Sequence, residues 1–157
     1  MDKGFTLIEV LIYSALVTII LSFSLIATYQ LIEFNDRGKH LRELADNQKF
    51  LEQKIYWTLQ GVSTINSPAA GATSTALSVN KVGYGFNPVV INFSDGAARL
   101  SRGGGAYQPI NNDWVLVQDL FFHQFTFSGQ PAIKIIGTLY DAFTSTTAAI
   151  DTTILTQ

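Results

Sequence analysis

Hydrophobic and polar positions divide this 157-residue chain into three segments with different patterns. From Val10 to Ile32 apolar residues occur on every side of a helix, and these 23 positions contain no charged residue, proline or glycine. A helix needs about 20 mostly apolar residues to cross the hydrocarbon core of a bilayer. We therefore predict a transmembrane helix in residues 5–32.

Two other interpretations of this apolar run are a cleaved secretory signal peptide and a buried core helix. A signal peptide has an apolar region of roughly 7–15 residues that ends at small residues. This run is longer and continues through Tyr29, Leu31 and Ile32. A core helix that is apolar on all sides would need a larger protein around it. The pattern therefore favours the membrane anchor.

Residues 33–62 are predicted to form an amphipathic helix. Apolar side chains recur there at intervals of three and four positions, with Gln48 at the one missing place. These apolar positions are Leu41, Leu44, Leu51, Ile55, Leu59 and Val62. Gly61 and Pro68 provide stop signals, and residues 35–38 (Asn-Asp-Arg-Gly) predict a bend or a melted turn. We expect the apolar stripe to be where a C-terminal domain docks.

Residues 63–157 are predicted to form a β-rich globular head. Residues 63–78 are a small-residue sequence typical of a loop. Residues 89–93 and 97–101 flank Ser-Asp-Gly, which predicts a β-hairpin. Further strands are expected in residues 114–118, 121–127, 133–139 and 149–156. Four or more antiparallel strands packed on the amphipathic helix would give an α+β fold.

The charge distribution sharpens this division. Residues 5–32 carry one charge, residues 33–57 carry ten, and residues 58–157 carry nine. A net charge of −2 argues against a partner held by a broad electrostatic field, above all nucleic acid. The absence of cysteine excludes a disulfide framework, a thiolate metal site and a cysteine nucleophile.

Glu9 is the single charge in the apolar segment. A carboxylate at membrane depth costs about 2.5–3.5 kcal/mol on insertion scales and usually finds a partner. It could also lie in the first helical turn, where the helix dipole favours a negative charge. Counting cations on both sides of the run places the C-terminal side in the cytoplasm, but long domains translocate largely regardless of charge.

The residues around Glu9 resemble a known signal. Residues 3–9 read Lys-Gly-Phe-Thr-Leu-Ile-Glu and precede the apolar run, and this combination resembles the class III signal of type IV prepilins and type II secretion pseudopilins. The resemblance implies that residues 1–4 are a leader, that a prepilin peptidase cuts between Gly4 and Phe5 on the cytoplasmic side, and that it methylates the new Phe5 amine. It also implies that Glu9 meets the N-terminal amine of a neighbouring subunit in the filament.

The same resemblance implies a location and partners. The chain would be a single-pass protein of the cytoplasmic (inner) membrane, with its N-terminus in the cytoplasm and its head outside, and then part of a periplasmic or cell-surface filament. Its partners would be other pilin or pseudopilin subunits, the prepilin peptidase, the inner-membrane assembly platform and, before assembly, membrane lipid. Ser14, Thr18 and Ser22 form a small-residue stripe that could allow close helix packing, although such stripes also arise by chance.

The head resembles a subgroup of this family more loosely. Leu100-x-Arg102, a glycine-rich turn, Pro109-Ile110 and Leu120-x-Phe122 are similar to J-type minor pseudopilins and W-type minor pilins. The apolar segment lacks a kinking proline and the head lacks a cysteine pair, which favours a minor subunit over a major type IVa pilin. Glu9 disfavours the K type. The resemblance implies a role at the filament tip or in assembly initiation.

The head offers few candidates for chemistry. We expect His40 to be solvated, His123 to be a hydrogen-bonded core or rim residue, and Gly103–Gly105 to form a mobile turn. Four oxygen-bearing residues could bind calcium, but a solvated turn is the favoured interpretation. These are Asn111, Asn112, Asp113 and Asp119. No nucleophile elbow, zinc motif or phosphate loop occurs in the sequence, so we expect a protein that is not an enzyme, holds no cofactor or metal and does not bind nucleic acid directly.

Two alternatives remain at this point. One is a membrane-tethered enzyme or ligand-binding head on a helical stalk, which would need a catalytic set that the sequence does not show. The other is a secreted soluble protein from which the first 30 or so residues are removed. The N-terminus of the mature protein distinguishes them, because a start at Phe5 indicates a pilin and a start near residue 30 indicates secretion.

Overall fold

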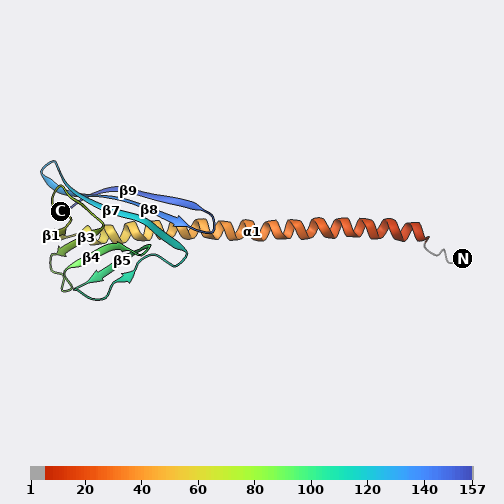
Figure 1. Cartoon of the computed structure of the whole chain (residues 1–157), viewed down its shortest axis with the longest axis horizontal. Coiled ribbons are helices and arrows are strands. Elements are labelled where there is room, and N and C mark those ends of the chain that lie inside the picture. Colours follow the sequence, from red (N-terminus) through yellow and green to blue (C-terminus); the bar gives the residue numbers. More distant parts are fainter. Residues whose placement is uncertain (1–5, 157) are drawn as a thin grey trace. The chain divides into compact units, whose positions relative to one another are not determined.

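A computed structural model describes residues 6–156, which form one helix and nine strands (Figure 1). This arrangement confirms the predicted α+β fold. By compactness the chain divides into two units, residues 1–39 and residues 40–157. The helix α1 (Leu7–Leu59) contributes to both units, and all nine strands belong to the second.

Helix α1 passes through the position where a bend was predicted. Residues 35–38 are helical, so the predicted bend or melted turn is wrong. A glycine inside a helix costs about 1 kcal/mol relative to alanine, which the many neighbouring helix formers of this 53-residue element offset. Asp36 and Lys39 add an ion pair of 3.2 Å between positions i and i+3 on the helix surface.

The C-terminal end of α1 is fixed by groups from outside the helix. Gly61 has a φ of 63°, a left-handed conformation that commonly ends a helix. The last turn contains no basic residue, but Lys81 Nζ donates a hydrogen bond to the Trp57 carbonyl oxygen and lies 3.9 Å from the Trp57 ring centroid. Burial lowers the pKa of the Lys81 ammonium. The helix therefore ends at Leu59, and Val62 begins a strand.

The first sheet is antiparallel and has the order β1-β3-β4-β5-β6. Its strands are β1 (Val62–Ser67), β3 (Ala76–Lys81), β4 (Val89–Ser94), β5 (Ala97–Arg102) and β6 (Gln108–Pro109). The predicted hairpin is confirmed as β4–β5, and its turn residues Asp95 and Gly96 have φ values of 51° and 71°. Positive φ at both positions is typical of the tight turns that match strand twist.

The prediction of a loop in residues 63–78 is wrong. These residues include most of β1, the two-residue strand β2 (Thr73–Ser74) and the start of β3. Their serine, threonine and asparagine side chains hydrogen-bond across the β1–β3 pair, including Asn80 Nδ2 to Thr64 Oγ1 at 3.0 Å. A composition of small polar residues therefore gives paired strands here because neighbouring strands satisfy its backbone groups.

The second sheet is also antiparallel, in the order β2-β7-β8-β9. Its long strands are β7 (Val115–Phe127), β8 (Gln130–Asp141) and β9 (Thr146–Leu155). Two strands predicted separately merge into β7, and a register shift between Val117 and Asp119 marks the place where they join. A bulge of this kind re-aims a strand without ending it.

The hydrophobic core combines residues of α1 and of both sheets. Leu51 and Ile55 of α1 are buried together with Ile91 of the first sheet and Phe122 and Ile135 of the second. This confirms that the apolar stripe is where the head docks, and Figure 1 shows strands of both sheets beside the C-terminal part of α1. Leu41, which was assigned to the stripe, is instead 44% exposed.

Candidate functional site

The first turn of α1 is organised by Thr6 and Glu9. The Thr6 backbone amide and its hydroxyl both donate to Glu9 Oε2, at 3.0 and 2.9 Å, and the Glu9 amide donates to Thr6 Oγ1 at 3.4 Å. This reciprocal pattern is a capping box, in which a threonine at the N-cap and a glutamate three residues later satisfy each other's backbone donors. The sequence contained this signal as Thr-x-x-Glu, and our sequence reasoning did not use it.

The capping box explains where an acidic residue can be placed in an apolar helix. The first backbone N–H groups of a helix have no intrahelical acceptor and carry a partial positive charge. Glu9 places its carboxylate at these groups, which stabilises the charge without a second chain. The predicted cleavage and methylation positions, Gly4 and Phe5, lie outside the described residues.

Beyond the first turn, α1 exposes an apolar surface. Among the described residues, α1 is the one helix long and apolar enough to cross a membrane, and none of its most apolar window is buried. The hydroxyls of Ser14, Thr18 and Ser22 donate to the carbonyl oxygens of Leu11, Ser14 and Thr18, at 2.7–2.9 Å. The stripe therefore offers small side chains whose hydroxyls are already satisfied, and this suits burial in lipid or against other helices.

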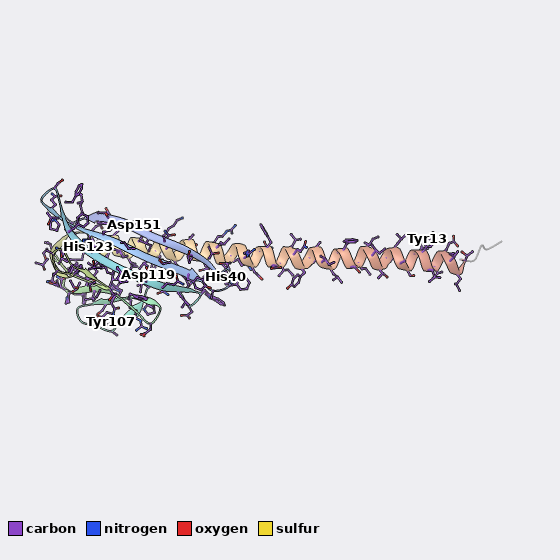
Figure 2. All side chains as sticks on the ribbon, turned by 45° about the horizontal axis from the view of Figure 1, so that its top comes forward. Tyr13, His40, Tyr107, Asp119, His123 and Asp151 are labelled. Carbon is purple, nitrogen blue, oxygen red and sulfur yellow. The ribbon has the colours of Figure 1, made fainter. Side chains whose placement is uncertain are left out.

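His40 is not the solvated residue that its sequence neighbours predicted (Figure 2). Its side chain is 18% exposed, and its Nδ1 lies 3.0 Å from Asp141 Oδ2. The Phe143 ring stacks on the imidazole at a centroid distance of 4.3 Å, and the Trp114 ring meets it edge-on at 5.7 Å. The prediction fails because the partner carboxylate is 101 positions away in sequence.

Asp141, at the end of β8, is fully buried. Its Oδ1 accepts hydrogen bonds from the backbone amides of Phe143 and Thr144 and from the Thr144 hydroxyl, at 2.8–3.2 Å. Burial raises the pKa of Asp141, but the hydrogen bonds from Thr144 and His40 and the charge of His40 outweigh this effect and hold the pKa below its ordinary value. The pair thus connects α1 to the β8–β9 turn.

The other candidates for chemistry have structural contacts. His123 is half-buried in β7, with its Nδ1 3.0 Å from Thr73 Oγ1, as expected for a rim histidine. Asn111 and Asn112 use their side chains within the loop before β7: Asn111 Oδ1 accepts from the Ala98 amide and Asn112 Oδ1 from the Val115 amide, at 2.9 and 3.0 Å. These amide oxygens are therefore engaged in shaping the loop.

Asn112 also ties this loop to helix α1. Its backbone amide donates to Asn47 Oδ1 and its side-chain amide to Glu43 Oε2, both at 2.9 Å. Within residues 6–156, no three His, Cys, Asp or Glu side chains are grouped so that they could hold a metal ion. An open groove of about 560 Å³ runs between α1 and β9, and Glu52 is its one acidic lining residue.

Comparisons with known proteins bear on the N-terminal segment. The family model described as the prokaryotic N-terminal methylation motif matches residues 1–25. Searches of the curated proteins and of the solved structures gave no significant match. The matched motif implies processing by a prepilin peptidase and assembly with other pilin subunits, and with the apolar helix it is consistent with membrane anchoring. Together with an α+β fold that begins in a long helix, the motif supports the assignment of this chain to the type IV pilin and pseudopilin family.

Proposed function

We propose that this protein is a minor pilin or pseudopilin, most similar to the J or W types, that is built into a type IV pilus or a type II secretion pseudopilus. The observation that carries the proposal is that the methylation motif coincides with a capped helix whose apolar window contains no buried residue. Such a surface is favourable only in lipid or against other helices, so its exposure in a single chain favours an assembly role.

The N-terminal residues have distinct roles in this proposal. The peptidase cleaves between Gly4 and Phe5 and methylates the Phe5 amine, which leaves the new terminus one residue from the N-cap Thr6. Before assembly, the capping box stabilises the Glu9 carboxylate at the membrane surface. In the filament, the amine of a neighbouring subunit supplies the countercharge, because an unpaired carboxylate in a packed apolar bundle is costly.

The location follows from the same helix. The N-terminus is cytoplasmic, residues 10–32 cross the inner membrane, and the head lies outside. An assembly platform extracts the helix from lipid into the filament, where the protein serves at the tip or in assembly initiation. The role is structural and not enzymatic, and the Asn111 and Asn112 side chains of the head take part in hydrogen bonds of their own loop.

The mature N-terminus provides the first test. Mass spectrometry of the chain purified from cells that carry a prepilin peptidase is expected to find a first residue of N-methylated Phe5. Deleting the peptidase should leave residues 1–4 attached. A mature protein that starts near residue 30 would instead show a secreted domain and contradict the proposal.

The charge of Glu9 can be separated from its capping role. Glu9→Gln keeps a side chain that can complete a capping box but removes the negative charge, whereas Thr6→Ala removes the capping hydroxyl and keeps the charge. We expect Glu9→Gln to impair filament incorporation strongly and Thr6→Ala to impair it less, as measured by the amount of subunit in sheared filaments. Normal incorporation of the Glu9→Gln variant, with processing intact, would contradict the charge-pair role.

A further inference from the structure

Two exposed aromatic rings contact His40, which is labelled in Figure 2 and is the first residue of the unit formed by residues 40–157. Trp114 comes from the segment before β7 and Phe143 from the β8–β9 turn. Both rings contact the His40 imidazole, yet Trp114 is 66% exposed and Phe143 is 61% exposed. We refer to Trp114 and Phe143 as the aromatic pair.

Contacts with His40 and Asp141 position the Phe143 ring of the aromatic pair. Phe143 stacks on an imidazole that is bonded to the fully buried Asp141, and Asp141 also accepts the Phe143 backbone amide at 2.9 Å. The Phe143 ring is therefore held by a hydrogen-bonded frame, and Trp114 contacts the same imidazole edge-on. Two large, exposed apolar rings that contact the same imidazole mark an interaction site.

The position of His40 along the chain indicates what covers these rings. Ile32 is the last residue of the apolar run, and His40 follows eight residues later. Eight residues span at most about 29 Å even when fully extended. Insertion of the apolar run therefore keeps His40 and the rings that contact it within this short reach of the membrane surface.

From this continuity we infer that the aromatic pair inserts into the headgroup layer of the membrane that holds the helix. The inference rests on the proposed membrane anchoring of residues 10–32. Tryptophan is enriched at membrane–water interfaces because its ring is apolar and its indole N–H can bond to polar groups. A phospholipid interface is thus the surface chemistry that suits an exposed Trp and an exposed Phe held by one histidine.

The charges on residues 33–43 of α1 do not favour anionic lipid. The segment between the apolar run and the core of the head carries three acidic and three basic residues, which balance. They are Glu33, Asp36, Arg37, Lys39, Arg42 and Glu43. Attraction to anionic lipid would need an excess of cations, so the aromatic pair should bind zwitterionic phosphatidylcholine as well as anionic mixtures.

The two tryptophans of the chain provide a matched experiment. The full chain is reconstituted in phosphatidylcholine vesicles that contain a lipid with a nitroxide on its headgroup, and tryptophan fluorescence is recorded. Trp57→Phe leaves Trp114 as the reporter, and Trp114→Phe leaves Trp57, which lies 17 residues beyond His40 in α1. We expect Trp114 to be quenched several-fold more strongly than Trp57, and Phe143→Ser in the Trp57→Phe background to reduce that quenching.

A second measurement avoids dependence on the Trp57 variant. The chain has no cysteine, so Phe143→Cys and Tyr107→Cys each create a single site for a spin label. Tyr107 is also exposed, in the segment before β6. Contact with lipid should make the label at 143, and not the label at 107, more accessible to membrane-soluble oxygen than to a water-soluble nickel complex.

The outcomes separate this inference from the proposed function. Vesicle flotation reports anchoring: a chain that floats while Trp114 and Trp57 are quenched equally overturns the inference and leaves the anchor intact. A chain that does not float overturns both. If Trp114 is not quenched in vesicles but is protected when filament subunits are added, the aromatic pair binds a subunit and the lipid inference is wrong.

Discussion

Asp141 is a fully buried carboxylate whose two oxygens have different hydrogen-bond partners. Oδ1 accepts the donors of the β8–β9 turn, and Oδ2 faces His40 of α1. A buried charge of this kind is tolerated because every bond favours its ionised form. Substitution of Asp141 should therefore lower the free energy of unfolding of the head more than the loss of any exposed ion pair.

We expect Asp141→Asn to lower the free energy of unfolding by about 1.5–3 kcal/mol near neutral pH, because hydrogen bonds to a buried charged group are lost. Chemical denaturation of the full chain in detergent measures this change. Asp151→Asn is the matched control, because Asp151 is exposed and its ion pair with Lys134 is at the surface. That control should change stability by at most about 1 kcal/mol.

The pH dependence of the Asp141 effect has a defined sign. The pKa of Asp141 is lower in the folded state than in the unfolded chain, so its stabilisation is complete above the unfolded value of about 3.9. It is lost as the pH falls through the folded pKa. The difference in stability between wild type and Asp141→Asn should therefore shrink below about pH 4, and a constant difference down to pH 3 would contradict this account.

The contacts of single residues differ in how well the sequence predicts them. The Thr6–Glu9 capping box is local, and its four-residue pattern could have been predicted from the sequence alone. The His40–Asp141 pair could not, because its members are 101 positions apart and the charged neighbours of His40 indicate a solvated side chain. Burial and tertiary contact decide the state of His40.

At the scale of elements, strong local patterns predicted the structure better than weak local preferences. The β4–β5 hairpin and the docking stripe of α1 were predicted correctly, because turn chemistry and helical periodicity act locally. The loop prediction for residues 63–78 and the bend at residues 35–38 were wrong. Weak local preferences were overridden there, by strand pairing in one case and by a long helix in the other.

Gly38 gives a test of the helix at the predicted bend. Gly38 is helical, and a Cβ added there would meet nothing within 4 Å. Gly38→Ala should stabilise α1 locally by about 1 kcal/mol and slow amide hydrogen exchange around residue 38 by about fivefold.

The control for this test is Gly61→Ala, which also adds a methyl group in open space. Because Gly61 has a φ of +63°, the substitution should have the opposite sign and speed exchange at the end of α1. Unchanged or faster exchange in Gly38→Ala would contradict the expected stabilisation of α1.

At the scale of the whole molecule, the core belongs entirely to one of the two units. Its first buried hydrophobic residue is Leu44, and the remainder come from later in α1 and from the sheets. The apolar window of α1 contributes nothing to this core. Folding of the head therefore should not need the anchor.

We expect a chain that begins at Glu33 to fold without detergent and to unfold in one cooperative transition in calorimetry. A chain that begins at Phe50 should be much less stable, because it lacks Leu44 and the Asn47 side chain that accepts the Asn112 amide. Aggregation of the longer chain, or a transition without cooperativity, would show that the head depends on residues 6–32.

The sequence by itself determined the features that depend on local order. These are the motif at the N-terminus, the apolar run, the helical periodicity that docks the head and the α+β class. Tertiary structure alone decided the pairing of strands into two sheets, the burial of Asp141, the placement of His40 and the contacts of Trp114 and Phe143 with His40. These contacts join residues far apart in the chain, and their free energy comes from burial and from geometry that no local pattern contains.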